Sequence, residues 1–62
     1  MRDPKRIPAL TKRLARAWVR LPDIRLGQLL VAAGGGFDYL LSVEDEELIK
    51  AVETLEKDLH GG

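Results

Sequence analysis

The stretch LPDIRLGQLLVAAGGG, residues 21–36, decides the fold of this chain, because it separates two helices and ends the second one. Pro22 pushes the residue before it out of the helical region, so a preceding helix ends there. Asp23 is a residue type that caps a new helix, and Gly34–Gly36 ends that helix. Apolar residues spaced by three and four lie between these signals: Leu26, Leu29, Leu30 and Ala33. The stretch therefore predicts a helix over residues 24–33.

Apolar spacing predicts a further helix on each side of this stretch. A helix over residues 8–20 places the following apolar residues on one stripe: Ile7, Leu10, Leu14, Ala17, Trp18 and Leu21. Residues 37–41 (FDYLL) are too few for a helix and predict a short extended segment. Ser42 is predicted to cap a third helix, over residues 43–59. We therefore expect an all-α fold, a three-helix mini-domain with a short extended segment between the second and third helices.

The length and composition predict a single small helical domain over residues 1–62, with Trp18 as its largest core residue. A domain this short buries only roughly 60% of its unfolded surface, so its stability depends on tight packing or oligomerisation. The chain has no cysteine, which excludes disulfides and thiolate metal sites, and His60 alone cannot hold a metal ion. We therefore expect no metal and no cofactor.

The sequence shows no targeting signal. No apolar run approaches the ~18 residues of a membrane span, and no apolar core follows the N-terminal charges as in a signal peptide. We therefore expect no membrane association and a cytoplasmic location, in a bacterium or a phage-infected cell. The terminal Gly61–Gly62 is like the tail of ubiquitin-like carriers, but those carriers have a β-grasp fold, so these glycines predict a frayed end.

The two halves of the chain carry opposite charge. Residues 1–31 hold eight basic and two acidic residues, a net charge of +6, and residues 32–62 hold two basic and eight acidic residues, a net charge of −6. Such a chain is expected to pair its halves with each other, to pair with a copy of itself, or to offer its basic half to an anion. The charge distribution alone does not choose among these three.

Four basic residues lie opposite the apolar stripe of the helix over residues 8–20: Lys12, Arg13, Arg16 and Arg20. Several cations on one helix face contact phosphates in proteins that bind nucleic acid. The alternative is that this face is solvated and pairs with acidic residues of the third helix, and we favour this interpretation because the whole chain is neutral. A helix-turn-helix would offer the bases only Arg25 and Gln28. Nucleic-acid binding through the basic face is therefore the alternative function.

The sequence contains no catalytic motif. Ser42 is the only candidate nucleophile, and the single His60 lies far from it, in the tail. The acidic run Glu44–Glu47 lacks the spaced oxygen ligands and the glycine turn of a calcium loop, and its charge suits a helix N-terminus. These features predict that the protein is not an enzyme.

A surplus of apolar residues lies away from the predicted stripes: Val19, Ile24, Val31, Leu40 and Leu41. In particular, Leu40 and Leu41 cannot both point inward from an extended segment. Scattered exposed apolar residues are normal, but several of them on a domain this small favour a partner surface. The leading functional hypothesis is a non-enzymatic protein–protein interaction module that forms a homodimer and binds another protein.

The segment PDIRLGQLL, residues 22–30, combines a helix cap, an internal glycine and a glutamine that is expected to be buried. Gly27 inside a helix costs up to about 1 kcal/mol relative to alanine, which predicts the close approach of another backbone there. Together with MRDPKRI (1–7), Trp18, Phe37, Tyr39 and EDEEL (44–48), this segment resembles a family of small bacterial and phage proteins of unknown function. The resemblance implies a compact helical module with no known activity, and it assigns no catalytic residue.

Overall fold

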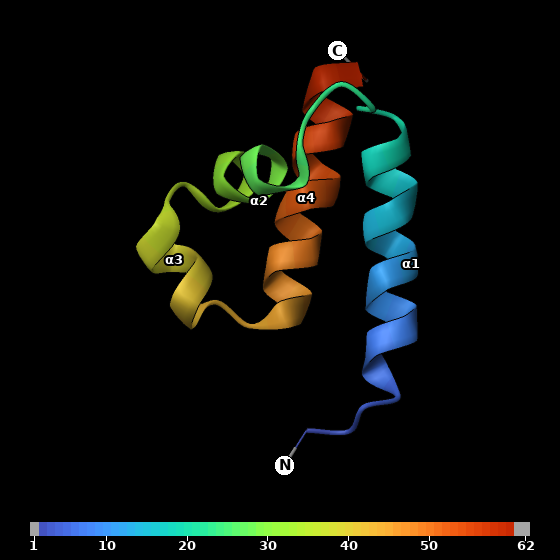
Figure 1. The fold of residues 1–62 in the computed structure, drawn as a ribbon, viewed down its shortest axis with the longest axis vertical. Helices are drawn as coiled ribbons and strands as arrows, with labels where there is room; N and C mark the ends of the chain where they lie inside the picture. The colour runs from blue at the N-terminus through green and yellow to red at the C-terminus, as the bar shows by residue number, and fades with distance from the viewer. Residues whose placement is uncertain (1, 61–62) are drawn as a thin grey trace.

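The structure is a computed structural model that describes residues 2–60, and the predicted frayed end at Gly61–Gly62 lies outside this range. The described chain is all-helical, which confirms the predicted fold class. It forms four helices, α1 (Arg6–Val19), α2 (Leu26–Gly34), α3 (Phe37–Ser42) and α4 (Asp45–His60) (Figure 1). Three of them correspond to the predicted helices, and the segment that was expected to be extended is the fourth, α3.

The longest helices, α1 and α4, lie side by side and run in the same direction (Figure 1). The last helix packs against both the first and the second, because α4 contacts both α1 and α2. α3 packs on α2 at the end away from α1. The resulting body is elongated, with extents of 38 × 24 × 18 Å.

The start of α1 shows how two prolines are accommodated. Pro4 lies in a turn that precedes the helix, where the Asp3 carboxylate accepts a hydrogen bond from the backbone N–H of Lys5 (2.9 Å). Pro8 is the third residue of the helix, where its missing N–H would have had no helical acceptor. α1 therefore begins at Arg6, two residues before the predicted start.

The start of α2 differs from the prediction, because Asp23 does not cap it. The chain makes a tight turn after α1, with the Ile24 N–H bonded to the Leu21 carbonyl (3.1 Å), and α2 begins only at Leu26. The side chain of Gln28 reaches back and accepts a hydrogen bond from the Arg25 N–H (3.3 Å). Gln28 was expected to be buried but is exposed, since its amide satisfies the start of the helix.

The close approach predicted at Gly27 occurs instead at Gly34. A Cβ on Gly27 would meet no atom within 4 Å, whereas a Cβ on Gly34 would lie 2.6 Å from the Tyr39 ring of α3. Gly35 then ends α2 in the left-handed conformation (φ 88°), with its N–H bonded to the Val31 carbonyl (2.7 Å). The glycines therefore allow α3 to fold back closely onto α2.

Residues 37–42 form a helix, so the predicted extended segment and the predicted cap at Ser42 are both wrong. A helix this short is unstable alone, and α3 forms because Tyr39 and Leu40 lie against Gly34. Ser42 is the last residue of α3, and its hydroxyl bonds back to the Asp38 and Tyr39 carbonyls (both 3.4 Å). α4 begins three residues later, at Asp45.

The fully buried core is small. Among the described residues it consists of Ala17, Leu29, Ile49 and Val52, from α1, α2 and α4. Trp18 was predicted as the largest core residue. It is instead half-buried and packs against the edge of the core, where its indole N–H donates to the Ile24 carbonyl (2.7 Å). The centre of the core is formed by Leu29 of α2 and Val52 of α4, which are both fully buried.

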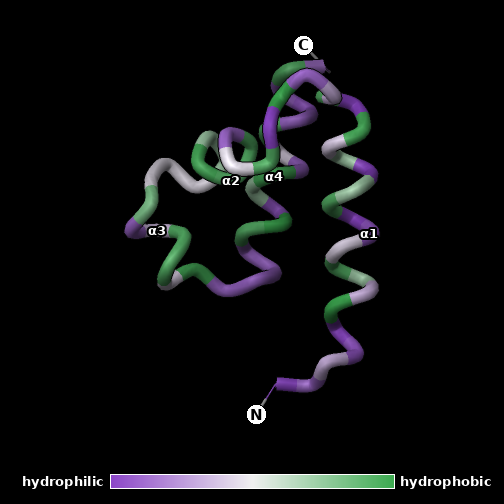
Figure 2. The backbone as a smooth tube through the Cα atoms, in the orientation of Figure 1, coloured by the Kyte–Doolittle hydropathy of each residue, from purple (hydrophilic) through white to green (hydrophobic). Residues whose placement is uncertain are grey.

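Figure 2 shows how hydropathy follows this arrangement. α1 and α4 alternate between hydrophobic and hydrophilic residues along their length, as expected for helices with one buried stripe. α2 and α3 carry hydrophobic residues along much of their length, interrupted by single hydrophilic positions (Figure 2), and α2 contacts both α4 and α3. The structure therefore separates a charged helix pair from an apolar helical hairpin.

Candidate functional site

The basic residues of α1 and the acidic residues of α4 form a ladder of ion pairs along one side of the two helices. The Arg6 guanidinium lies 3.0 Å from the Asp45 carboxylate near the start of both helices. Seven residues further along α1, Arg13 contacts Glu53, and Arg20 follows after seven more. Because the helices are parallel, each contact joins residues about forty positions apart.

Arg13 is the centre of this ladder. Its guanidinium holds the Glu53 carboxylate through two hydrogen bonds (2.7 and 3.0 Å) and also contacts Glu46. A fork of this kind matches the two carboxylate oxygens in distance and in direction. Hydrogen bonding to Arg13 lowers the pKa of Glu53, and the two carboxylates raise the pKa of Arg13. The charges at the middle of the ladder are therefore held in their ionised forms.

The N-terminal end of the ladder is a cluster of four charged residues that includes Arg2. Arg2 contacts Glu44 at 2.9 Å and Asp45 at 3.2 Å, and Asp45 also accepts the hydrogen bond from Arg6. Hydrogen bonding to Arg6 is the main cause that lowers the pKa of Asp45. The acidic start of α4 is therefore neutralised by the N-terminal segment.

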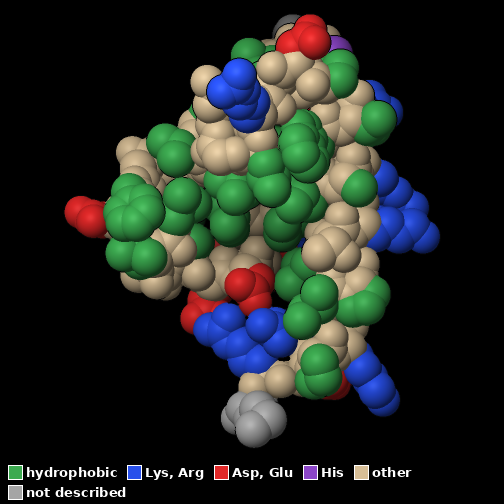
Figure 3. Space-filling model, viewed as in Figure 1, with side chains coloured by type: hydrophobic (Ala, Val, Ile, Leu, Met, Phe, Trp, Pro, Cys, Tyr) green, Lys and Arg blue, Asp and Glu red, His purple; other side chains and the backbone are tan. Residues whose placement is uncertain are grey.

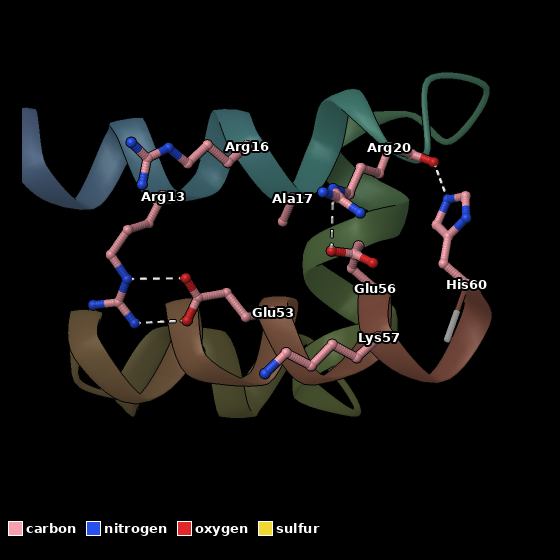
Figure 4. A pocket seen from close by; sticks show the side chains of 8 residues that line it. All are labelled: Arg13, Arg16, Ala17, Arg20, Glu53, Glu56, Lys57 and His60. Carbon is pink, nitrogen blue, oxygen red and sulfur yellow. Dashed lines mark hydrogen bonds and ion pairs between the residues drawn. The ribbon is translucent and has the colours of Figure 1, made fainter. Parts of the chain in front are cut away.

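The C-terminal end of the ladder is looser. Arg20 approaches Glu56 only to 3.8 Å, and Glu56 is largely buried between the helices. The imidazole Nε2 of His60 bonds to the backbone carbonyl of Arg20, which joins the ends of α1 and α4 (Figure 4). His60 was expected to lie in the tail, but it is the last residue of α4 and satisfies a carbonyl at the end of α1.

A wide, open pocket of about 560 Å³ lies along this end of the ladder. Figure 4 shows its charged lining, with arginines on α1 facing carboxylates on α4. Its residues are Arg13, Arg16, Ala17, Arg20, Glu53, Glu56, Lys57 and His60. None of them is a serine, threonine or cysteine, and the carboxylates are interleaved with the cations, so the lining is not a uniformly basic surface.

The predicted basic face is thus divided between two roles. Arg13 and Arg20 contact carboxylates of α4, as expected from pairing between the two halves of the chain. Lys12 and Arg16 are exposed and make no ion pair with any residue in the described part of the chain. The Arg16 side chain runs along α1 and does not cross to α4 (Figure 4).

The other side of the molecule is apolar. Figure 3 shows hydrophobic side chains that extend from α3 across α2 towards α1, with Arg and Lys beside Asp and Glu at the N-terminal end of this face. Of the five residues predicted for a partner surface, Val19, Val31 and Leu41 are exposed, while Ile24 and Leu40 are half-buried. Ile24 and Leu40 are in part used by the fold, because Ile24 packs on the core and Leu40 lies against Gly34.

Phe37, which was not among the residues predicted for a partner surface, is also an exposed apolar residue. Its side chain is 69% exposed, close to the 73% of Leu41 one helical turn further on. Residues four apart share a face of a helix, so the spacing of Phe37 and Leu41 would have indicated this pair, had residues 37–41 been predicted as helical. Other large apolar residues are also exposed: Ile7, Leu26, Tyr39 and Leu59.

A small apolar cleft of about 220 Å³ lies between α1 and the start of α4. Five of the eight residues that line it are aliphatic, and three are polar or charged. The lining residues are Arg6, Ile7, Leu10, Thr11, Leu14, Asp45, Leu48 and Ile49. The cleft is on the opposite side of the helix pair from Arg13 and Arg16, because Ile7, Thr11 and Leu14 share the other face of α1. The α1–α4 pair therefore presents charge on one side and apolar surface on the other.

Comparisons of this chain with protein-family models, with curated proteins and with solved structures found no match. Within residues 2–60, no group of three or more acidic or histidine side chains is placed to hold a metal ion. No helix in the same range has both the length and the apolar character needed to cross a membrane.

Proposed function

We propose that this protein is a non-enzymatic interaction module of the cytoplasm that forms a homodimer through the apolar face of α2 and α3. The observation that carries the proposal is that the solvent-accessible surface of the chain is larger than expected for a compact monomer of its mass. The chain exposes 4725 Å², whereas a compact monomer of 6.9 kDa is expected to expose about 4000 Å². The difference of roughly 700 Å² is close to the ~800 Å² that each partner buries in an interface of standard size.

The shape and the core support the same proposal. The radius of gyration is 11.6 Å, and a compact chain of this length is expected to have about 10.6 Å. Apolar residues make up 45% of the sequence, but only four apolar side chains in the described chain are buried. A second copy would cover apolar surface that one copy cannot bury by itself.

Ion pairs between two copies are expected to stabilise the dimer less than burial of apolar side chains does. The acidic residues of α4 that face α1 already have arginine partners within the chain. Exposed ion pairs contribute about 0–1 kcal/mol each and weaken with salt, while burial of one leucine or phenylalanine contributes about 1.5–3 kcal/mol. We therefore expect an association that changes only modestly between low and physiological salt.

Sedimentation of matched aspartate variants tests the proposal. Leu41 and Val19 are almost equally exposed, at 73% and 72%. Val19 belongs to α1, outside the proposed contact face of α2 and α3, and lies about 140° around that helix from Leu14. Leu41→Asp should raise the dimer Kd at least tenfold to a hundredfold, which corresponds to about 1.5–3 kcal/mol. Val19→Asp and the charge variant Glu46→Ala should change it little. A wild type that stays monomeric at high micromolar concentration would contradict the proposal.

Nucleic-acid binding remains the alternative function, and it depends on Lys12 and Arg16, whose charges have no carboxylate partner in the described chain. A binder of this kind loses affinity steeply as salt rises. A low-salt electrophoretic shift of duplex DNA that disappears in Lys12→Ala/Arg16→Ala would favour it. These substitutions leave the ladder intact, so such a loss would not reflect unfolding.

A further inference from the structure

We infer that the homodimer forms by reciprocal insertion, in which α3 of each copy seats Phe37 and Leu41 in the apolar cleft between α1 and α4 of the other copy. This inference rests on the proposed self-association and specifies its contact. It follows from three features of the described chain: an apolar projection, an apolar cleft of matching size, and the positions of both on one face.

The projection is the outer face of α3. Phe37 and Leu41 lie one turn apart on the same side of this helix and are among its most exposed apolar residues. The opposite side of α3 is held in place, because Tyr39 and Leu40 lie against Gly34 of α2. α3 therefore presents two large apolar side chains on a supported helix, which lowers the entropy that ordering them on binding would cost.

The receiving site is the cleft lined by Ile7, Leu10, Leu14, Leu48 and Ile49. Its volume of about 220 Å³ is below the roughly 300–1,000 Å³ of sites that enclose small-molecule ligands. A cleft of this size and aliphatic character suits one or two apolar side chains. Buried aromatic and aliphatic anchors of this kind contribute most of the affinity in protein interfaces.

The positions of the two features allow a closed dimer. α3 and the cleft lie on opposite sides of α4, and both lie towards the start of α4, because α3 leads into this helix and Leu48 and Ile49 line the cleft (Figure 1). A two-fold axis parallel to α4 exchanges these two sides when a second copy is placed face to face. Each α3 then lies over the cleft of the other copy, and the contact closes without leaving a free site.

Charge at the rim agrees with this register. Asp38 is the exposed acidic residue of α3, next to Phe37, and Arg6 lies at the rim of the cleft with its guanidinium partly exposed. These opposite charges make α3 and the cleft complementary in charge as well as in apolar character, which favours their association. Arg6 keeps its contact with Asp45 in this arrangement, so the ladder is not required to open.

Disulfide cross-linking between single-cysteine variants tests the inference, since the native chain has no cysteine. Leu41→Cys should cross-link to Thr11→Cys in a second, size-tagged copy, because Thr11 lines the cleft. We expect this pair to react roughly tenfold or more faster than Leu41→Cys with Val19→Cys, owing to the effective concentration inside a dimer. Val19 is as exposed as Leu41 and lies away from the cleft, so this pair measures random collision.

The outcomes separate this inference from the proposed function. If sedimentation shows a dimer but Leu41→Cys links to itself or to Val19→Cys as fast as to Thr11→Cys, the insertion is wrong and the self-association stands. If the wild type sediments as a monomer at every concentration, both proposals fail. Selective linkage of Leu41→Cys to Thr11→Cys, together with a sedimenting dimer, supports both.

Discussion

Two glycines of α2 offer a sharp test of the fold, because alanine should have opposite effects at them. Gly27 lies in the first turn of α2, where an added Cβ meets no atom within 4 Å. Gly27→Ala should therefore stabilise the protein by about 0.5 kcal/mol, the lower end of the difference in helix propensity between these residues. For a domain of this size, that gain raises the melting temperature by roughly 2–4 °C.

Gly34 is the counterpart at the other end of the same helix. A Cβ there would lie 2.6 Å from Cδ2 and 3.1 Å from Cε2 of Tyr39, and 3.2 Å from Cδ2 of Leu40. Both side chains would have to move, which detaches α3 from α2. Forced overpacking costs about 1–3 kcal/mol, so Gly34→Ala should lower the melting temperature by at least roughly 4 °C.

Thermal unfolding followed by circular dichroism measures both effects. Dilute protein is required, because dimerisation would make the melting temperature depend on concentration. Ala32→Gly, an exposed change in the last turn of α2, calibrates the propensity scale and should cost up to about 1 kcal/mol. If Gly27→Ala destabilises the protein, the open surroundings described for Gly27 are wrong, and if Gly34→Ala does not, the packing of α2 against α3 is wrong.

Three further predictions concern the core and the ladder. Leu29→Ala should cost about 2–5 kcal/mol, a large share of the ~3–9 kcal/mol expected for 62 residues, and urea denaturation should show partial or complete unfolding. Trp18→Phe keeps an aromatic ring but is smaller and leaves the Ile24 carbonyl without its indole N–H donor, so the same assay should show a loss of at least about 1 kcal/mol. Arginine contacts lower the pKa values of Asp45 and Glu53 in the folded protein. These two carboxylates therefore stabilise the fold fully above their pKa values in the unfolded chain, near ~4, and this stabilisation is lost as the pH falls through their pKa values in the folded protein. The melting temperature should therefore be flat above about pH 5 and decrease towards pH 3.

The sequence was sufficient to predict three helices, because each carries an apolar stripe of at least two turns. The ends of these helices were less predictable. Asp23 and Ser42 are good capping residues, but neither caps the helix assigned to it. The turn after α1 extends to Arg25, and the start of α2 depends on the amide of Gln28. In each junction several residues were chemically suitable to begin the next helix, and tertiary packing determined where that helix begins.

α3 was not predictable from its own residues. Six residues are too few to form a stable helix alone, and the contact that holds α3 is a glycine in a different helix. The prediction of exposed apolar residues consequently named Leu40 and Leu41 together, although the helix turns Leu40 inwards and Leu41 outwards. By contrast, the seven-residue spacing of Arg6, Arg13 and Arg20 was visible in the sequence and would have indicated the ladder.

The topology explains why an apolar face remains exposed. The ladder joins residues about forty positions apart in the same order along both helices, which makes α1 and α4 parallel. Parallel neighbours cannot be joined by a short turn, so the chain must cross back from the end of α1 to the start of α4. The hairpin of α2 and α3 makes this crossing, and α2 packs on α4 through one side only. The charges pair within the chain along α1 and α4, whereas apolar side chains of the crossing segment, among them Val31, Phe37 and Leu41, remain exposed.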